Sequence, residues 1–193
     1  MPVAEDARIT PMDDLGQAPQ VSEITADDVD ELLTLVDEIG VTIWLDGGWG
    51  VDALLGHQTR LHGDLDIVIQ SSEVETLRGA LVGRGFSIVD DYDNREWNFL
   101  LGDDDGRQVD FHVIELDVDG NGVYGPPGDG VSYPAWALNG IGSLESRRVR
   151  CLTAEYQVES HTGYLLRDVD HLDVAALCRR FGIDLPPEYQ GDG

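Results

Sequence analysis

Two carboxylates lie one residue apart in the segment Asp64-Leu65-Asp66, shortly after a pair of adjacent glycines. The apolar and β-branched residues of segment 64–69 predict a strand, on which successive side chains point to opposite faces. Asp64 and Asp66 are therefore expected to point the same way. Two carboxylates aligned like this repel each other unless a cation, usually a divalent metal, lies between them. The pair predicts a metal site.

A third carboxylate, Asp110, lies between apolar neighbours in another predicted strand and could complete this group. Gly47 and Gly48 have no Cβ, so their N–H groups can approach an anion closely, and the N-terminus of the following helix adds partial positive charge. Arg60 and His62 lie in a loop before the acidic pair, where they could contact phosphate oxygens. Nucleotidyl transfer needs metal ions, close backbone approach to a triphosphate and a positioned nucleophile. The residues together indicate that chemistry.

The elements that must position these residues follow from local signals. Apolar residues at helical spacing, preceded by Thr25 as N-cap and followed by Gly40, predict the first helix. Alternating or continuous apolar runs bounded by turn residues predict the strands. The sequence predicts an α/β (α+β) unit up to residue 152 and two C-terminal helices, with helices at 26–39, 49–55, 71–84, 153–166 and 170–181, strands at 41–46, 64–69, 86–90 and 147–152, a hairpin of 95–101 with 108–116, and a loop at 117–130.

The chain has 193 residues, of which 41% are hydrophobic, enough for one domain with a core of its own. No apolar run approaches the length of a membrane span and no secretory signal is visible, so we expect a cytoplasmic protein that does not bind membranes. Cys151 and Cys178 lie in apolar settings without nearby ligand-type residues. They are expected to be buried, reduced thiols.

The formal net charge is −26, and all 12 basic residues are Arg. Such a surface repels polyanions, which argues against nucleic-acid binding. An acidic pocket for a cationic substrate, adaptation to a high-salt cytosol and a high-GC genome are alternative explanations. Because the acidic residues are scattered along the chain, we favour a solvated surface of halophilic type.

Several other residues have two interpretations. Asp46 and Asp52 are better explained as caps than as catalysts, and Asp168, Asp170 and Asp173 as caps and surface charges. Trp44 is typical of a core, while Trp49 and Trp97 could belong to the core or line a pocket. His112 shares the face of Asp110, as a site residue or as a hydrogen-bonded core imidazole.

Two segments match known binding motifs only in part. Segment 48–53 fits a dinucleotide fingerprint, but the next strand ends in Gln70 where a ribose-binding acid is expected. Segment 117–122 matches the opening of a calcium loop, yet position twelve is Gly128 instead of Glu. We interpret the first as a weak alternative and the second as a turn.

Segment 44–52 reads Trp-Leu-Asp-Gly-Gly-Trp-Gly-Val-Asp, and Arg60, His62 and the Asp-Leu-Asp-Ile run follow it. With Asp-Phe-His at 110–112 and His-Thr-Gly-Tyr at 161–164, this pattern resembles the lincosamide nucleotidyltransferases and their aminoglycoside-modifying relatives, within the polymerase-beta-like superfamily. The likeness spans about residues 39–173. It implies a nucleotidyltransferase fold with a mixed, mainly antiparallel sheet flanked by helices and with short C-terminal helices.

The resemblance also implies the reaction: AMP moves from ATP, or another NTP, to a hydroxyl of a small acceptor, and pyrophosphate leaves. In this family pattern Asp64 and Asp66 bind Mg²⁺, and Asp110 completes the metal site or accepts the hydroxyl proton. Gly47 and Gly48 hold the triphosphate. His161 and Tyr164, one turn apart on a predicted helix, could face the nucleotide, although a packed helix seam explains their spacing equally well.

The implied organisation is a flexible acidic arm at 1–22, a nucleotidyltransferase core at 23–152, a helical segment packed on the core at 153–185 and a tail at 186–193. The acceptor is expected to be an antibiotic of lincosamide or aminoglycoside type, and the protein a monomer or homodimer. Alternatives are an antitoxin-like enzyme that modifies a protein, and a non-catalytic nucleotide-binding module. Three converging carboxylates argue against the module, because binding alone does not need them.

Overall fold

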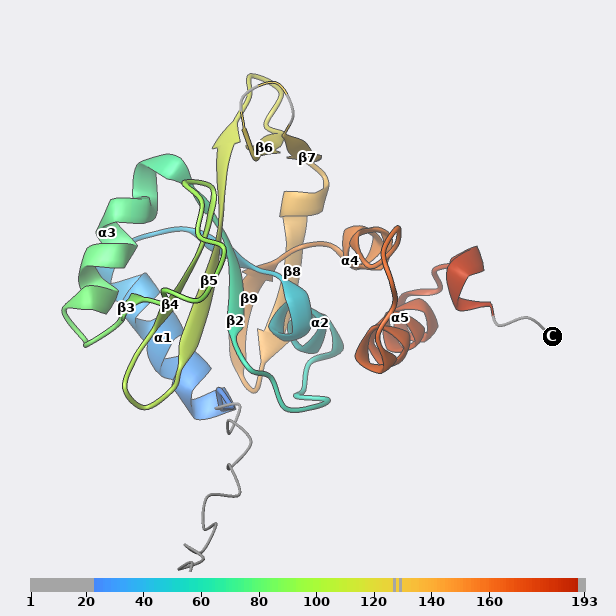
Figure 1. Ribbon diagram of the computed structural model, residues 1–193. Helices are drawn as coiled ribbons and strands as arrows, with labels where there is room; N and C mark the ends of the chain where they lie inside the picture. The colour runs from blue at the N-terminus through green and yellow to red at the C-terminus, as the bar shows by residue number, and fades with distance from the viewer. Residues whose placement is uncertain (1–22, 127, 129, 191–193) are drawn as a thin grey trace, which may run out of the picture.

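The computed structural model describes residues 23–126, 128 and 130–190. Within these residues, nine strands form one sheet, in the order β3-β4-β5-β2-β1-β9-β8, and the β6–β7 hairpin extends β5 (Figure 1). The β2–β5 and β1–β9 pairs are parallel, while the other pairs are antiparallel. This confirms the predicted mixed, mainly antiparallel sheet. The strands are β1 Ile43–Leu45, β2 Leu65–Gln70, β3 Ser87–Ile88, β4 Asn98–Gly102, β5 Gln108–Leu116, β6 Gly122–Tyr124, β7 Val131–Tyr133, β8 Gly140–Leu144 and β9 Arg147–Cys151.

The helices lie in two groups on either side of the β2–β5 strands (Figure 1). On one side are α1, Ala26–Ile39, and α3, Ser71–Val82. On the other are α2, Gly47–Leu55, α4, Ala154–Ser160, and α5, Asp168–Phe181. Short 3-10 helices at Ala137–Asn139 (η1) and Pro187–Tyr189 (η2) complete the described chain.

The predicted first helix is confirmed as α1. Thr25 and Asp28 form a capping box at its N-terminus, and Gly40 ends it in the left-handed conformation with φ 71°. Both devices satisfy backbone groups that a helix leaves unpaired at its ends. The apolar stripe of α1 is buried against the sheet.

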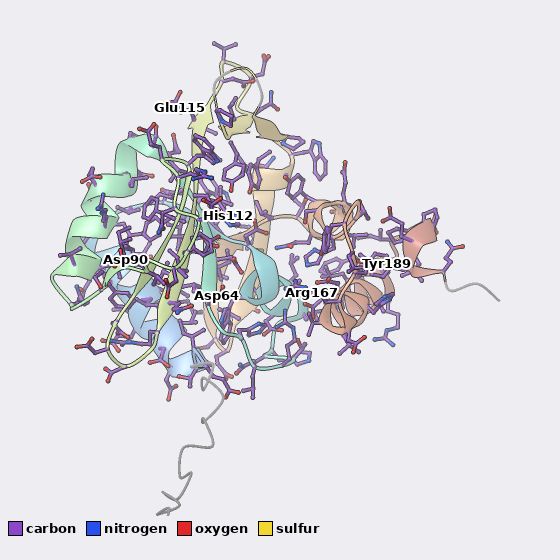
Figure 2. All side chains as sticks on the ribbon, viewed as in Figure 1. Asp64, Asp90, His112, Glu115, Arg167 and Tyr189 are labelled. Carbon is purple, nitrogen blue, oxygen red and sulfur yellow. The ribbon has the colours of Figure 1, made fainter. Side chains whose placement is uncertain are left out.

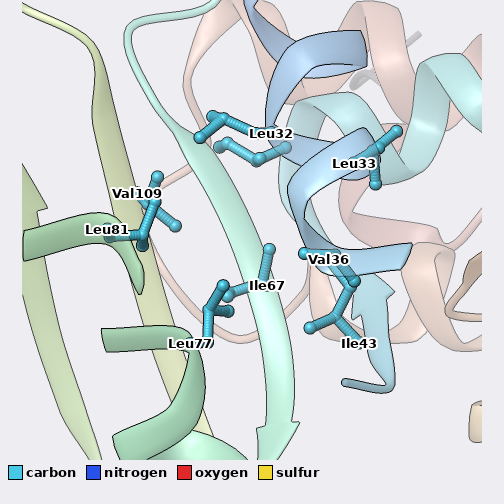
Figure 3. A pocket seen from close by; sticks show the side chains of 9 residues that line it. Leu32, Leu33, Val36, Ile43, Ile67, Leu77, Leu81 and Val109 are labelled. Atoms are coloured by element: carbon cyan, nitrogen blue, oxygen red, sulfur yellow. The ribbon is translucent and has the colours of Figure 1, made fainter. Parts of the chain in front are cut away.

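The main core lies between α1, α3 and the sheet. Figure 3 shows apolar side chains of both helices meeting those of β2 and β5. They surround a void of about 10 Å³. Such an apolar void stays dry, because a water molecule there would find no polar partner. Strand alternation sends Leu65, Ile67 and Ile69 into this core. Asp66 and Val68 therefore face the opposite side of the sheet, toward α2 and α4.

The structure differs from the predicted elements in the strands that follow residue 117 and in the bounds of several elements. Segment 117–130, predicted as a loop, contains β6, and the sequence signals missed β7 and β8. The predicted 153–166 helix ends at Ser160, and α2 begins at Gly47 with Asp46 as its N-cap. A short strand next to an existing one is stabilised by its partner's hydrogen bonds, a long-range effect that overrides a Gly-rich local sequence.

Three further predictions concern the cysteines, membrane spans and the two ends of the chain. Both cysteines are buried and free, as expected. Among the described residues, no helix combines the length and the apolar character that a membrane crossing requires. The predicted acidic arm at 1–22 and the last residues of the tail lie outside the described residues.

Candidate active site

A row of three carboxylates crosses the sheet on the face opposite the main core. Asp66 on β2 is in direct register with Asp110 on the parallel strand β5. Asp46 follows β1 and donates its backbone N–H to the carbonyl of Asp66 at 3.0 Å. Residues in register on adjacent strands point to the same face, so the three side chains lie side by side. The pairing of β2 with β5 brings together carboxylates that are far apart in the sequence.

His112 lies one step further along β5 and faces all three carboxylates. Its Nε2 atom is 3.8 Å from Asp110 Oδ2 and 4.0 Å from Asp66 Oδ1, and its Nδ1 atom is 3.3 Å from Asp46 Oδ2. Ligand atoms of Asp66, Asp110 and His112 all lie within 4.8 Å of one another. Of the two interpretations of His112, the structure supports the site residue.

Asp64 directly precedes β2 and lies outside that close group, half-buried. Figure 2 shows Asp64 and His112 near the middle of the molecule, away from peripheral residues such as Glu115. The charge of Asp64 still acts on the close group, because it helps to raise the pKa of Asp66. Asp64 and Asp66 therefore interact electrostatically, and a shared metal site for the two remains a prediction.

The negative charge of the carboxylates around His112 favours a bound cation. Burial in the first place, together with the neighbouring carboxylates of Asp64, Asp46 and Asp110, raises the pKa of Asp66 to about 8, against the opposing charge of His112. Burial and the charge of Asp110 raise the pKa of Asp64 as well. Burial lowers the pKa of His112, but its carboxylate neighbours outweigh this and hold the pKa well above the usual value. One imidazolium does not balance four carboxylates, so the donor set fits a divalent cation.

Asp110 is held in place through both of its carboxylate oxygens. The Tyr92 hydroxyl donates to Oδ2 at 2.8 Å, and the Asn98 side-chain amide donates to Oδ1 at 2.7 Å. Asn98 pairs with His112 across the hairpin, which places it on the site face. The sequence reasoning did not single out Tyr92 or Asn98. Hairpin register could have revealed Asn98, whereas no local signal marks Tyr92.

The glycine pair lies directly against the acidic group and its preceding loop. Gly47 has φ 51°, and a Cβ built on it would lie 2.0 Å from Asp66 Oδ2. A Cβ on Gly48 would lie 2.2 Å from a ring nitrogen of His62 and 2.8 Å from a guanidinium nitrogen of Arg60. A Cβ at either position would displace these side chains, so the backbone at the start of α2 approaches the groups closely.

Arg60 and His62 are each fixed by a buried carboxylate. Arg60 donates to Asp173 of α5, with Nη2 at 2.8 Å from Oδ2, and its side chain is 25% exposed. The Nε2 atom of His62 pairs with Asp52, which is fully buried and also accepts from Thr59. The prediction of Asp173 as a surface charge is wrong, because the turn of α5 that carries it faces Arg60. Asp52 is not a cap, since it lies inside α2.

Two predicted nucleotide-binding residues do not lie where the sequence placed them. His161 is the C-cap of α4 and is buried, with Nδ1 2.6 Å from the Gln157 carbonyl. Tyr164 lies beyond the helix and is 46% exposed. The helix ends at Ser160, and the chain turns again between the two residues at Gly163, where φ is 82°. The prediction that His161 and Tyr164 share one helix face is therefore wrong.

The remaining sequence alternatives are decided by burial. Trp44 and Trp49 are buried in the core, and Trp97 lies on the α3 side of the sheet, away from Asp110. Asp46 is the N-cap of α2, as predicted, and accepts from the Gly47 N–H at 2.7 Å. Asp170 forms a capping box with Arg167, which confirms it as a capping residue, although it is fully buried.

Comparison with known proteins points to one family. The family model described as aminoglycoside-2''-adenylyltransferase matches residues 28–177. A lincosamide resistance protein of Staphylococcus haemolyticus is 30% identical over 161 residues, which cover 81% of this chain and 96% of the relative. A 2''-aminoglycoside nucleotidyltransferase of Escherichia coli is 34% identical over 65 residues, which cover 32% of this chain and 37% of the relative.

Solved structures agree with this assignment. The lincomycin-bound crystal structure of the lincosamide antibiotic adenylyltransferase LnuA superimposes with a TM-score of 0.70 at 29% identity, covering 80% of this chain and 97% of that one. The aminoglycoside enzyme ANT(2'')-Ia, in complex with adenylyl-2''-tobramycin, gives a TM-score of 0.62 at 20% identity, covering 81% of this chain and 89% of that one, and supports the fold alone. The resemblance seen in the sequence is thus confirmed, and the chain belongs to the aminoglycoside-2''-adenylyltransferase family and is an enzyme of the nucleotidyltransferase class.

Proposed function

We propose that this protein transfers AMP from ATP to a hydroxyl of a small antibiotic of lincosamide or aminoglycoside type, in a Mg²⁺-dependent reaction. The observation that carries the proposal is the register of Asp66 with Asp110, with the start of α2 packed directly against Asp66. Nucleotidyl transfer requires carboxylates beside a backbone that can approach a triphosphate. The relatives with lincosamide and 2''-aminoglycoside names support the acceptor type.

The phosphate-binding part of the site would be the start of α2 and the loop before β2. The backbone N–H of Gly48 would bind the triphosphate at the positive end of the α2 dipole, and Gly47, whose own N–H donates to Asp46 Oδ1, would keep the approach free of a side chain. Arg60, beside Gly48 and oriented by Asp173, would contact the phosphate oxygens, and His62 would support the turn from its pairing with Asp52. His161, which is buried at the end of α4, and Tyr164, which lies beyond that helix, are not proposed as nucleotide ligands.

Asp64, Asp66 and Asp110 would hold the metal. When bound there, Mg²⁺ would neutralise charge on the phosphate oxygens and favour attack at the α-phosphorus. The acceptor hydroxyl oxygen then forms a bond to the α-phosphorus, and the bond to pyrophosphate breaks. The hydroxyl proton passes to a carboxylate oxygen of Asp110 or to water. The hydrogen bonds from Tyr92 and Asn98 fix the orientation of Asp110 for either role.

The test is incubation with Mg²⁺, ATP labelled at the α-phosphate and a panel of lincosamides and aminoglycosides. We expect label on an acceptor, with Asp66→Asn and Asp110→Asn losing transfer on the order of 10²-fold or more. Asp104→Asn, a change at an exposed carboxylate on the β4–β5 turn, is the matched control and should keep the wild-type rate. Calorimetry with Mg²⁺ separates the roles of Asp110: a variant that keeps metal affinity but loses the rate identifies a proton acceptor.

Two outcomes would contradict the proposal. If ATP binds but no small acceptor is labelled, the acceptor assignment fails. If Asp66→Asn transfers AMP as fast as Asp104→Asn does, the carboxylate row is not the reaction centre.

A further inference from the structure

Four aromatic side chains form a continuous chain of ring contacts that begins beside the carboxylate row. We call Tyr124, Tyr133, Trp136 and Tyr156 the aromatic wall. Its ring centroids are 5.9 Å apart for Tyr124 and Tyr133, 5.3 Å for Tyr133 and Tyr156, and 5.9 Å for Tyr156 and Trp136. The ring of His112 lies 5.7 Å from that of Tyr124, so the wall connects the carboxylates to the protein surface.

Sheet pairing places the wall on the face of the site. Tyr124 on β6 is in register with Ile114 on β5. Ile114 lies an even number of residues from Asp110 and His112, so all three side chains lie on the same face of β5. This face of β5 points away from the main core. Tyr133 on β7 and Tyr156 on α4 pack on Ile114, Trp44 and Val68 in a second buried cluster. The wall therefore has a rigid apolar support.

The wall is open at one end. Tyr133 and Tyr156 are buried, Tyr124 is half-buried, and Trp136 is 45% exposed. A large ring held half in water on a rigid support loses little conformational entropy on binding and offers broad contact area. Ligand sites of proteins are lined in this way, by apolar rings with a few polar tips.

The wall and the phosphate-binding turn lie on opposite sides of the carboxylate row. Gly48, Arg60 and Asp64 lie beside the start of β2, before Asp66. His112, Ile114 and Tyr124 lie on the other side, in the direction in which β2 and β5 run. In nucleotidyl transfer the attacking oxygen and the leaving pyrophosphate are in line on opposite sides of the phosphorus. With the pyrophosphate on the glycine side, the attacking acceptor comes from the side of the wall.

We propose that Tyr124 and Trp136 bind the acceptor by stacking on an apolar face of its ring, and that this wall selects an acceptor with at most one positive charge. The proposal rests on the proposed function, because it assigns the acceptor side of that reaction. The wall itself carries no carboxylate that could pair with several ammonium groups. The charges that act on Tyr156 are those of Asp46, which belongs to the row that the metal would engage, and of Glu159 on α4.

The polar tips of the wall are neutral phenols. Burial, together with the Asp110 and Asp46 carboxylates, raises the pKa of Tyr124 to about 12. Burial in the first place raises the pKa of Tyr156 to about 12. Neutral phenol groups can donate and accept hydrogen bonds with sugar-like hydroxyls, whereas they offer no charge to a polycation.

The experiment measures KM separately for the acceptor and for ATP in four single variants, with lincomycin as the acceptor. We expect Trp136→Ala and Tyr124→Ala to raise KM for the acceptor about tenfold and to change KM for ATP less than about twofold. Trp97→Ala, which removes a half-buried indole on the other face of the sheet, is the matched control and should change neither constant. Trp136→Phe keeps a ring and should restore most of the acceptor affinity, which separates stacking from loss of folding.

A second measurement does not depend on transfer. Titration of lincomycin without ATP should change the tryptophan emission of the wild type and not that of Trp136→Phe. If this signal appears but no AMP is transferred, the wall binds the acceptor and the proposed function fails. If transfer occurs while neither alanine variant changes KM for the acceptor, the wall proposal is overturned.

Two other results would also overturn it. A rise in KM for ATP alone would assign the wall to the nucleobase. A KM for a multiply charged aminoglycoside lower than that for lincomycin would contradict the charge selectivity.

Discussion

Substitution of Gly47 by Ala tests whether the start of α2 fixes the Asp66 carboxylate. Gly47 has φ 51°, and the new Cβ would lie 2.0 Å from Oδ2 and 2.7 Å from Cγ of Asp66. Gly40 provides a matched control, since it has φ 71° and open space around its missing Cβ. Both variants require an alanine in the left-handed region, but only Gly47→Ala also collides with the site.

The expected costs follow from these two contributions. A left-handed alanine costs about 1–2 kcal/mol, and forcing a methyl group into a packed site costs about 1–3 kcal/mol more. Gly40→Ala should therefore lower Tm by roughly 2–8 °C and Gly47→Ala by roughly 4–20 °C, at about 2–4 °C per kcal/mol for a chain of this size. Displacement of Asp66 by about 1 Å should lower kcat/KM on the order of 10²-fold.

The assay combines thermal unfolding, calorimetric Mg²⁺ titration and the rate of AMP transfer. Gly40→Ala should lower only the Tm, whereas Gly47→Ala should also lower the affinity for Mg²⁺ and the rate of AMP transfer. If Gly47→Ala matched Gly40→Ala in all three measurements, the close approach of α2 to Asp66 would play no part in the site.

Three further predictions concern titration and hydrogen bonding. The pKa of Asp66 is about 8 in the folded protein and about 4 in an unfolded chain, so between these values the folded state holds a proton that the unfolded state lacks. Without metal, the free energy of unfolding should therefore fall as pH rises from about 4 to 8. The affinity for Mg²⁺ should rise over the same range and level off above about pH 8. Calorimetry that shows no proton release on Mg²⁺ binding at pH 7 would refute this. Tyr92→Phe removes a 2.8 Å hydrogen bond to Asp110 and should cost about 1 kcal/mol of stability and about tenfold in kcat; an unchanged kcat would show that this bond does not orient the carboxylate. Burial raises the pKa of Cys151 to about 12 and raises that of Cys178, so a disulfide reagent should label neither thiol until denaturant is added, and rapid labelling of the native protein would contradict their burial.

The sequence by itself determined the elements whose signals are local. The capping pair around Thr25, the left-handed glycine at Gly40 and the apolar period between them specify α1, because each depends on neighbours within a few residues. The alternation in β2 specifies that Leu65 is buried and that Asp66 faces the other way. These signals come from residues that are close together in the chain, so a reader of the sequence can find them.

Tertiary structure alone decided which distant residues meet. The parallel pairing of β2 with β5 joins Asp66 to Asp110, while Arg60 meets a carboxylate 113 residues away on α5. Tyr92 reaches Asp110 from a loop whose sequence shows no sign of it. A local pattern can specify a helix face or a strand face, but not the partner it packs against, because the partner is chosen by the burial and hydrogen bonding of the whole fold.

The same reason explains where the sequence misled. His161 and Tyr164 have helical spacing, yet Gly163 adopts a left-handed conformation and separates them. β6 forms in a Gly-rich segment because β5 offers an unpaired edge there, and the aromatic wall follows from that pairing. The residue types for metal and phosphate chemistry could be read from the sequence, whereas the side from which an acceptor approaches exists only in the folded protein.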